Sequence, residues 1–260
     1  MTAGKLQGRH IVITRPPGQA SRLSRLIEAE AGIAHMFPLI EIVPLQDYRA
    51  FDAVIAGLED YDWAIFISSN AVEHAMPRLL AHSAGTPSGL RFAAIGPVTA
   101  TSLAGYGVSQ TLTPSQRFDS EALLALPEMQ AVAGRKIVIF RGVGGREVLA
   151  ESLRARGASV TFAECYRRIN PQRNADSLHQ LWQNGDLDAI VVTSSEAMRH
   201  LLALAGDNAP WLAATPLCVN HARIGELANS YGLTTTVADA PGDEAMLACL
   251  IRTMDHSKDL

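Results

Sequence analysis

An internal duplication constrains the fold of this chain more than any other feature of its sequence. GRHIVITR at 8–15 matches GRKIVIFR at 134–141, and DWAIFISSNAV at 62–72 matches DAIVVTSSEAM at 188–198, both at an offset of 126 residues. A third pair, AIGPVTATSLA at 94–104 and CVNHARIGELA at 218–228, has an offset of 124. Solenoid repeats are far shorter, about 20–50 residues. Three matches in one order therefore predict two copies of a whole domain.

Within each copy, apolar runs alternate with amphipathic segments. In the first copy we expect strands at 8–15, 61–67 and 90–95, and helices at about 20–31, 51–58, 68–81 and 98–104. The run 61–67 is apolar almost throughout, which is typical of a parallel strand covered on both faces. The pattern predicts an α/β fold with two similar lobes, each a parallel sheet flanked by helices.

Two extended segments join the copies, FPLIEIVPL at 37–45 and FAECYRRINP at 162–171. The prolines at 38 and 44 favour an edge strand or a linker over a central strand. We expect the two segments to form a ribbon between the lobes, with a ligand cleft at that ribbon.

Length and composition limit the class of protein. The chain has 260 residues, enough for two ordinary domains, and is 48% hydrophobic and 18% charged. No apolar run approaches the roughly 18 residues of a membrane span, and the N-terminus lacks the apolar core of a secretory signal. We therefore expect a cytoplasmic protein. Three separated cysteines in no CxxC pair predict reduced structural thiols.

Charge is distributed unevenly along the chain. The net charge of -4 argues against general affinity for nucleic acid, but residues 135–173 contain nine Lys or Arg and three acids. That segment is +6 and the remainder is -10. A basic field of this kind attracts a specific anion, although solvated helix faces would give the same count.

Polar residues follow several of the predicted strands, at the edge where open α/β sheets bind ligands. These candidates are Arg15, Ser68, Ser69, Asn70, Gly96, Arg141, Gly142, Thr193, Ser194, Ser195 and His221. The loop RGVGGRE at 141–147 offers backbone N–H groups to an anion, with Arg146 beside it. It matches neither a dinucleotide fingerprint nor a P-loop, and a flexible glycine turn is the alternative.

The serine pairs and the histidines have simple structural interpretations. No GxSxG elbow surrounds the serines, so helix capping is favoured over covalent catalysis, and a capped helix start can still contact a ligand. His74 and His200 are equivalent in the repeat, which favours a shared structural role. No metal-ligand spacing is present, so we predict neither a metal site nor a cofactor. We expect Tyr166 to lie on an edge strand, where its hydroxyl can donate a proton, although packing is the common role of a tyrosine on an edge strand.

Taken together, ITRP at 13–16, DWAIFISSNAV, AIGPVTA, FRGVGGREVLAESLRARGASVTFAECYRR and AIVVTSSEAM resemble the uroporphyrinogen-III synthase family, from about Gly8 to Ile251. The resemblance implies two lobes, 1–36 with 172–260 and 46–163, joined by a two-stranded ribbon of 37–45 and 164–171. It implies an enzyme of heme biosynthesis that closes hydroxymethylbilane, a linear tetrapyrrole, into uroporphyrinogen III. Water is lost and ring D is inverted through a spirocyclic intermediate, without metal or cofactor.

The resemblance also implies roles for individual residues. Tyr166 corresponds to the family's linker tyrosine and would be the general acid for loss of the ring A hydroxyl. Thr99, after Gly-Pro, would contact substrate, whereas the second copy has Arg223 at that position. The eight carboxylates of the substrate fit the basic segment. We expect a monomer without nucleic-acid or membrane partners.

A protein of a different class would show much of the same pattern. A non-catalytic, two-lobed receptor for an anionic small molecule also has duplicated α/β lobes, but it would not need Tyr166.

Overall fold

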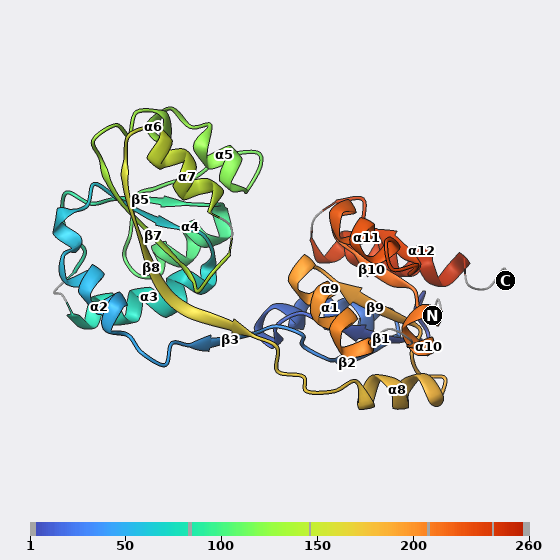
Figure 1. Cartoon of the computed structure of the whole chain (residues 1–260). Coiled ribbons are helices and arrows are strands. Elements are labelled where there is room, and N and C mark those ends of the chain that lie inside the picture. The colour runs from blue at the N-terminus through green and yellow to red at the C-terminus, as the bar shows by residue number, and fades with distance from the viewer. Residues whose placement is uncertain (1–3, 83–84, 146, 207–208, 241, 257–260) are drawn as a thin grey trace. The chain divides into compact units, whose positions relative to one another are not determined.

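The computed structural model describes residues 4–82, 85–145, 147–206, 209–240 and 242–256 (Figure 1). The chain divides into two compact units, Met1–Glu41 with Ile169–Leu260, and Ile42–Arg168. The first unit therefore combines an N-terminal and a C-terminal part of the sequence, which Figure 1 shows in blue and in gold to red. In the described ranges, no helix combines the length and the apolar character that crossing a bilayer requires.

Unit 1 is built on a five-stranded sheet with the order β11-β10-β9-β1-β2, in which every neighbouring pair is parallel. Its strands are β1 (His10–Ile13), β2 (Ile33–Met36), β9 (Ala189–Val192), β10 (Leu217–Val219) and β11 (Thr235–Val237). Its helices are α1 (Pro17–Ala29), α8 (Asp176–Gln183), α9 (Ser195–Ala205), α10 (Pro210–Ala214), α11 (Ala222–Asn229) and α12 (Asp243–His256).

Unit 2 is built on a six-stranded sheet with the order β3-β8-β7-β4-β5-β6. Its strands are β3 (Glu41–Pro44), β4 (Trp63–Phe66), β5 (Arg91–Ala94), β6 (Thr111–Leu112), β7 (Lys136–Gly142) and β8 (Ser159–Ile169). Its helices are α2 (Arg49–Ala56), α3 (Ser69–His82), α4 (Pro97–Ala104), α5 (Ser120–Leu124), α6 (Pro127–Gln130) and α7 (Val148–Ala155), with a 3₁₀ turn at Leu58–Asp60. β8, β7, β4, β5 and β6 are parallel to one another.

The chain passes between the units inside β3 and inside β8. These two strands are neighbours in the sheet, and β8 therefore has a partner on each side. The boundaries of a separate linker ribbon stay a prediction.

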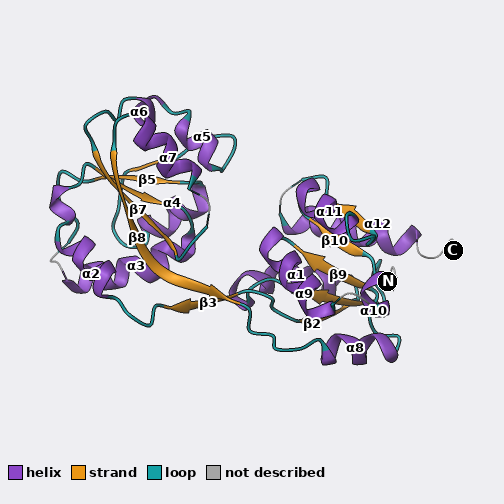
Figure 2. Cartoon of the chain, viewed as in Figure 1, coloured by secondary structure: helices purple, strands orange, loops and turns teal. Residues whose placement is uncertain are grey.

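Both faces of the unit 2 sheet are covered, as its apolar strands predicted. Ala64 and Phe66 of β4 belong to one buried cluster, whereas Trp63 and Ile65 belong to another. Alternate residues of a strand point to opposite faces, so each face has its own core. Figure 2 shows the helices that flank the strands of each unit. The predicted α/β class with parallel sheets is confirmed.

The duplication is visible in one pair of interactions that the two units share. In unit 2, the Asp62 carboxylate accepts hydrogen bonds from the side chain of Arg135 and from the backbone N–H of Lys136, both at 2.8 Å. In unit 1, Asp188 accepts the equivalent bonds from the side chain of Arg9 at 2.7 Å and from the backbone N–H of the next residue at 2.8 Å. Each aspartate thus ties together the amino ends of two central strands.

Replacing Asp62 with asparagine is expected to lower the free energy of unfolding by roughly 1–2 kcal/mol at pH 7. The Lys136 N–H and the Arg135 guanidinium hold the pKa of Asp62 below its ordinary value of 3.8. Its stabilising effect is therefore complete above about pH 4 and is lost as the pH falls. Urea unfolding at pH 7 and pH 3 measures this, with Asp188→Asn as the matched variant. Equal midpoints for wild type and Asp62→Asn at pH 7 would contradict the prediction.

The three cysteines are free and buried, which confirms the expected structural thiols. Burial raises the pKa of Cys165 to about 12, so this thiol is not a nucleophile at neutral pH.

Candidate functional site

The serines that follow β4 and β9 cap the next helix in the same way. Ser68 Oγ accepts a hydrogen bond from the N–H of Ala71 at 3.1 Å, and Ser194 Oγ accepts one from the N–H of Ala197 at 3.0 Å. Each serine satisfies a donor at a helix start that otherwise lacks a partner inside the helix. The predicted capping role is confirmed for both residues.

In unit 2 the candidates gather at one edge of the sheet. β8, β7, β4 and β5 are adjacent and parallel, so their carboxyl ends meet there. At or just beyond these strand ends lie Ser68, Ser69, Asn70, Gly96, Thr99, Arg141, Gly142 and Tyr166.

Tyr166 is held in the interior of this edge, with 3% of its surface exposed. Its hydroxyl lies 3.3 Å from Ser68 Oγ at the start of α3. The His74 ring packs against the tyrosine ring, with centroids 5.6 Å apart. The phenol is therefore placed between a strand end and a helix start, where it can act on a ligand at this edge.

A β-bulge sets the position of the tyrosine ring. Arg141 pairs with Glu164, but the next residue of β7, Gly142, pairs with Tyr166, so β8 carries one extra residue here. A Cβ atom on Gly142 would lie 2.6 Å from the Tyr166 ring. Only glycine allows this approach of backbone to ring.

His74 is a site residue that the sequence did not reveal. Its equivalent, His200, contacts the carbonyl of Leu39 through Nδ1 at 2.7 Å, so the two histidines have different surroundings. Burial lowers the pKa of His74, opposed by nearby Glu73. The ring beside Tyr166 is therefore neutral at neutral pH. Its position six residues after Ser68, on the helix that this serine caps, is the signal that could have indicated it.

The Arg141 side chain forms hydrogen bonds with the loop that follows it. Its side chain is buried, with 3% exposed, and donates to the carbonyls of Gly142, at 3.2 Å, and Gly144. Its guanidinium also stacks over the Phe162 ring, 4.5 Å from the centroid. The N–H of Gly144 donates to Glu164 Oε1 at 3.0 Å. These contacts of Arg141 stabilise the conformation of the loop.

A second guanidinium lies close to the same loop. A Cβ on Gly145 would be 2.9 Å from Arg141 Nη2 and 3.5 Å from Arg168 Nη2. Arg168 also lies over the Tyr166 ring, 6.0 Å from its centroid. Two guanidinium groups close to this loop favour an anionic ligand at this edge. Arg146, also predicted here, lies outside the described residues.

Thr99 is buried, as Arg141 and Tyr166 are. It lies on α4 with 4% of its surface exposed. Gly96, which precedes this helix, is buried as well.

In unit 1 the candidates also share one sheet edge. The adjacent strands β1, β9 and β10 end there, next to Arg15, Thr193, Ser194, Ser195, His221 and Arg223. Arg15 is paired with Asp243. His221 Nδ1 accepts a hydrogen bond from the N–H of Arg223 at 3.2 Å and so caps α11. Ser195 Oγ is buried, and within the described residues it has no hydrogen-bond partner.

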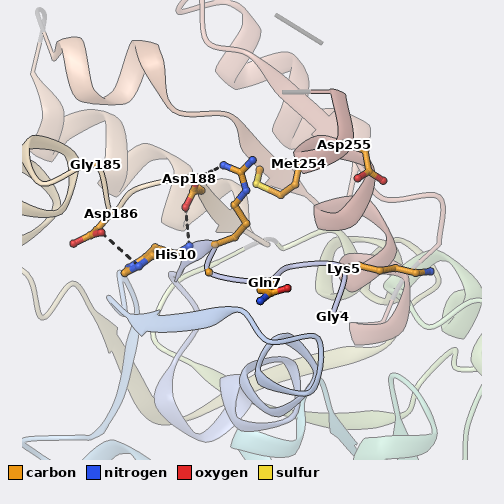
Figure 3. A pocket seen from close by; sticks show the side chains of 11 residues that line it. Gly4, Lys5, Gln7, His10, Gly185, Asp186, Asp188, Met254 and Asp255 are labelled. Carbon is orange, nitrogen blue, oxygen red and sulfur yellow. Dashed lines mark hydrogen bonds and ion pairs between the residues drawn. The ribbon is translucent and has the colours of Figure 1, made fainter. Parts of the chain in front are cut away.

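A cavity of about 760 Å³ lies at the opposite edge of the unit 1 sheet, among residues that precede β1 and β9 (Figure 3). In its lining, Arg9 pairs with Asp188 at 2.7 Å, and His10 Nε2 lies 3.4 Å from Asp186 Oδ1. This cavity lacks the capped helix starts of the other edge, and we do not assign the site to it.

Comparisons with known proteins agree with one another. The family model described as "Uroporphyrinogen-III synthase HemD" matches residues 21–248. The uroporphyrinogen-III synthases of Salmonella typhimurium and Escherichia coli K12 are 35% and 34% identical, each over 92% of this chain and 99% of the relative. A uroporphyrinogen III synthase structure from the bacterium Thermus thermophilus superposes with a TM-score of 0.66 at 14% identity, covering 96% of this chain and 100% of that one. The Helicobacter pylori structure gives a TM-score of 0.57 at 15% identity, covering 94% and 99%.

Proposed function

The chain belongs to the uroporphyrinogen-III synthase family of porphyrin-biosynthesis enzymes, and we propose that it closes hydroxymethylbilane into uroporphyrinogen III with Tyr166 as the proton donor. The observation that supports this most directly is the contact of the Tyr166 hydroxyl with Ser68 at the start of α3. A phenol is protonated at neutral pH and can donate to a leaving hydroxyl.

The proposed reaction begins at ring A of the substrate. Tyr166 Oη gives its proton to the ring A hydroxyl as the carbon–oxygen bond breaks, and water leaves. The electron-rich ring D then attacks the freed methylene carbon through its substituted carbon and forms the spirocyclic intermediate. Rearrangement inverts ring D, and the proton that ring D loses restores the phenol. Over the whole catalytic cycle, the net change is therefore the loss of one water molecule from the substrate.

Positioning decides which isomer forms. Closure without the enzyme gives the unrearranged isomer I, so the protein has to favour attack through the substituted carbon. Helix starts and guanidinium groups bind carboxylates well, and the substrate carries eight of them. The residues described at the carboxyl edges of the two sheets are our candidates for these contacts. We place the enzyme in the cytoplasm as a monomer without nucleic-acid partners, which sedimentation of the purified protein tests in part.

The test is a product analysis with freshly prepared hydroxymethylbilane. The products are oxidised to uroporphyrins, and isomers I and III are separated by chromatography, with buffer and heat-denatured protein as controls. The expected result is predominantly isomer III, formed in proportion to enzyme. Isomer I alone, at the rate of the buffer control, would overturn the proposal and leave a binding protein for an anionic ligand.

A further inference from the structure

The hydroxyl groups of Ser68 and Tyr166 form the last step of a hydrogen-bond chain that starts at helix α3. The N–H of Ala71 donates to Ser68 Oγ at 3.1 Å, and Ser68 Oγ lies 3.3 Å from Tyr166 Oη. We infer that Ser68 is a positioning residue that donates its proton to Tyr166 Oη and so leaves the phenolic proton free for the substrate. This inference rests on the function proposed above for Tyr166.

The direction of the second hydrogen bond follows from the groups available to each hydroxyl. A serine hydroxyl has one proton to donate and two lone pairs that accept. Ala71 occupies one lone pair of Ser68, and Tyr166 is the remaining partner of Ser68 Oγ in the described part of the chain. If Tyr166 donated to Ser68 instead, the Ser68 proton would have no acceptor among the described residues, and the phenolic proton would point away from the substrate. Donation by Ser68 satisfies both hydroxyls.

The same arrangement stabilises the state that follows proton transfer. Once Tyr166 has given up its proton, its oxygen carries a negative charge that can only accept hydrogen bonds. Because the side chain is 3% exposed, water contributes little, and the donors must come from the protein. Ser68 supplies one, and the N–H groups at the start of α3 polarise it. Hydrogen bonds to a charged acceptor are stronger than those to a neutral one, so Ser68 stabilises the transition state more than the bound substrate.

The internal repeat supplies a control for the helix-capping role of Ser68. Ser194 occupies the equivalent position in unit 1 and caps α9 through Ala197 N at 3.0 Å. Among the described residues, this is the one hydrogen bond that the Ser194 side chain forms. Ser194→Ala therefore reports how much thermal stability a cap of this kind contributes, and Ser68→Ala should lose a similar amount, about 2–4 °C in Tm.

A double-mutant cycle between Ser68→Ala and Tyr166→Phe tests the inference. In the wild-type background, Ser68→Ala is expected to lower kcat by about 10- to 100-fold with KM changed less than about 2-fold. The alkaline limb of the kcat–pH profile is expected to move to higher pH, because the charged oxygen has lost a donor. In the Tyr166→Phe background, the same substitution should change the residual rate by less than about 2-fold. Ser68→Thr should restore most of the rate.

A second variant separates this effect from helix capping. Ser68→Gly also removes the hydroxyl. At the capping position, however, glycine lowers helix stability much less than alanine does. It should lose as much kcat as Ser68→Ala with a smaller loss of Tm. An unchanged kcat in Ser68→Gly, or an equal loss for Ser68→Ala with and without the phenol, would overturn the inference. Wild-type turnover in Tyr166→Phe would instead remove the role proposed for Tyr166, which the single variant shows by itself.

Discussion

Tyr166→Phe is expected to lower kcat by about 100-fold or more while the fold and KM stay close to wild type. The substitution removes the hydroxyl that donates the proton and keeps the ring that packs against His74 and Gly142. Slow turnover has a second consequence, because spontaneous closure then competes. The fraction of isomer I among the products should rise as the enzymatic rate falls. Initial rates with hydroxymethylbilane and chromatography of the oxidised products measure both effects.

A second tyrosine of the same unit provides the matched control. Tyr106 packs against the core cluster that contains Tyr166, but it follows the far end of α4. Tyr106→Phe should leave kcat and the isomer ratio within about 2-fold of wild type. If Tyr166→Phe also turned over at the wild-type rate with isomer III as the product, Tyr166 would not be the acid. A large fall in its Tm would show that the substitution had disturbed packing instead.

Much of the fold could be predicted because it depends on patterns that are local in sequence. Apolar runs bounded by glycine and proline located the strands, and the constant offset of the repeat predicted two sheets. The strand pairing of the two joining segments was harder to predict from the sequence. β8 was expected to be an edge strand at Tyr166, yet it lies between β3 and β7. Strand order depends on contacts between distant residues, which one sequence does not reveal.

The site was predictable to the extent that residue type determines local geometry. A serine before an amphipathic helix is a cap in most contexts, and Ser68 and Ser194 are caps here. Arg141 shows the opposite case, because a guanidinium after a buried strand was expected to face a ligand and instead donates to Gly142 and Gly144. The glycine loop folds back over the end of β7 and supplies carbonyl acceptors. Whether Arg141 also contacts substrate stays a prediction.

The two copies share hydrogen bonds that stabilise the domain and differ in the side chains near the helix caps. Asp62 and Asp188 tie equivalent strands with equivalent hydrogen bonds. The serine caps are also shared, but among the residues that the structure describes, the cap in unit 2 is the one with a tyrosine hydroxyl beside it. The proposed acid chemistry therefore belongs to unit 2, whereas unit 1 is expected to contribute binding.

Gly142→Ala is expected to lower kcat by about 100-fold, nearly as much as removal of the phenol. The new Cβ would lie 2.6 Å from Tyr166 Cε2 and 2.7 Å from Cζ, the carbon that bears the hydroxyl. Such distances are far below van der Waals contact, so the ring or the strand has to move by several tenths of an ångström or more. A displacement of about 1 Å at a reacting group can reduce the rate about 100-fold. Overpacking should also lower the free energy of unfolding by about 1–3 kcal/mol.

Two further variants connect this loss to the tyrosine ring. A Cβ on Gly89, in the same unit, would meet no atom within 4 Å, so Gly89→Ala should leave kcat unchanged and stability unchanged or slightly higher. In a Tyr166→Ala background the ring is absent, and the stability cost of Gly142→Ala should largely disappear, which urea unfolding of the four proteins in the cycle measures. An equal cost in both backgrounds would mean that Gly142 is required by the bulge itself. Disappearance of the cost would show that the backbone of β7 holds the phenol against Ser68.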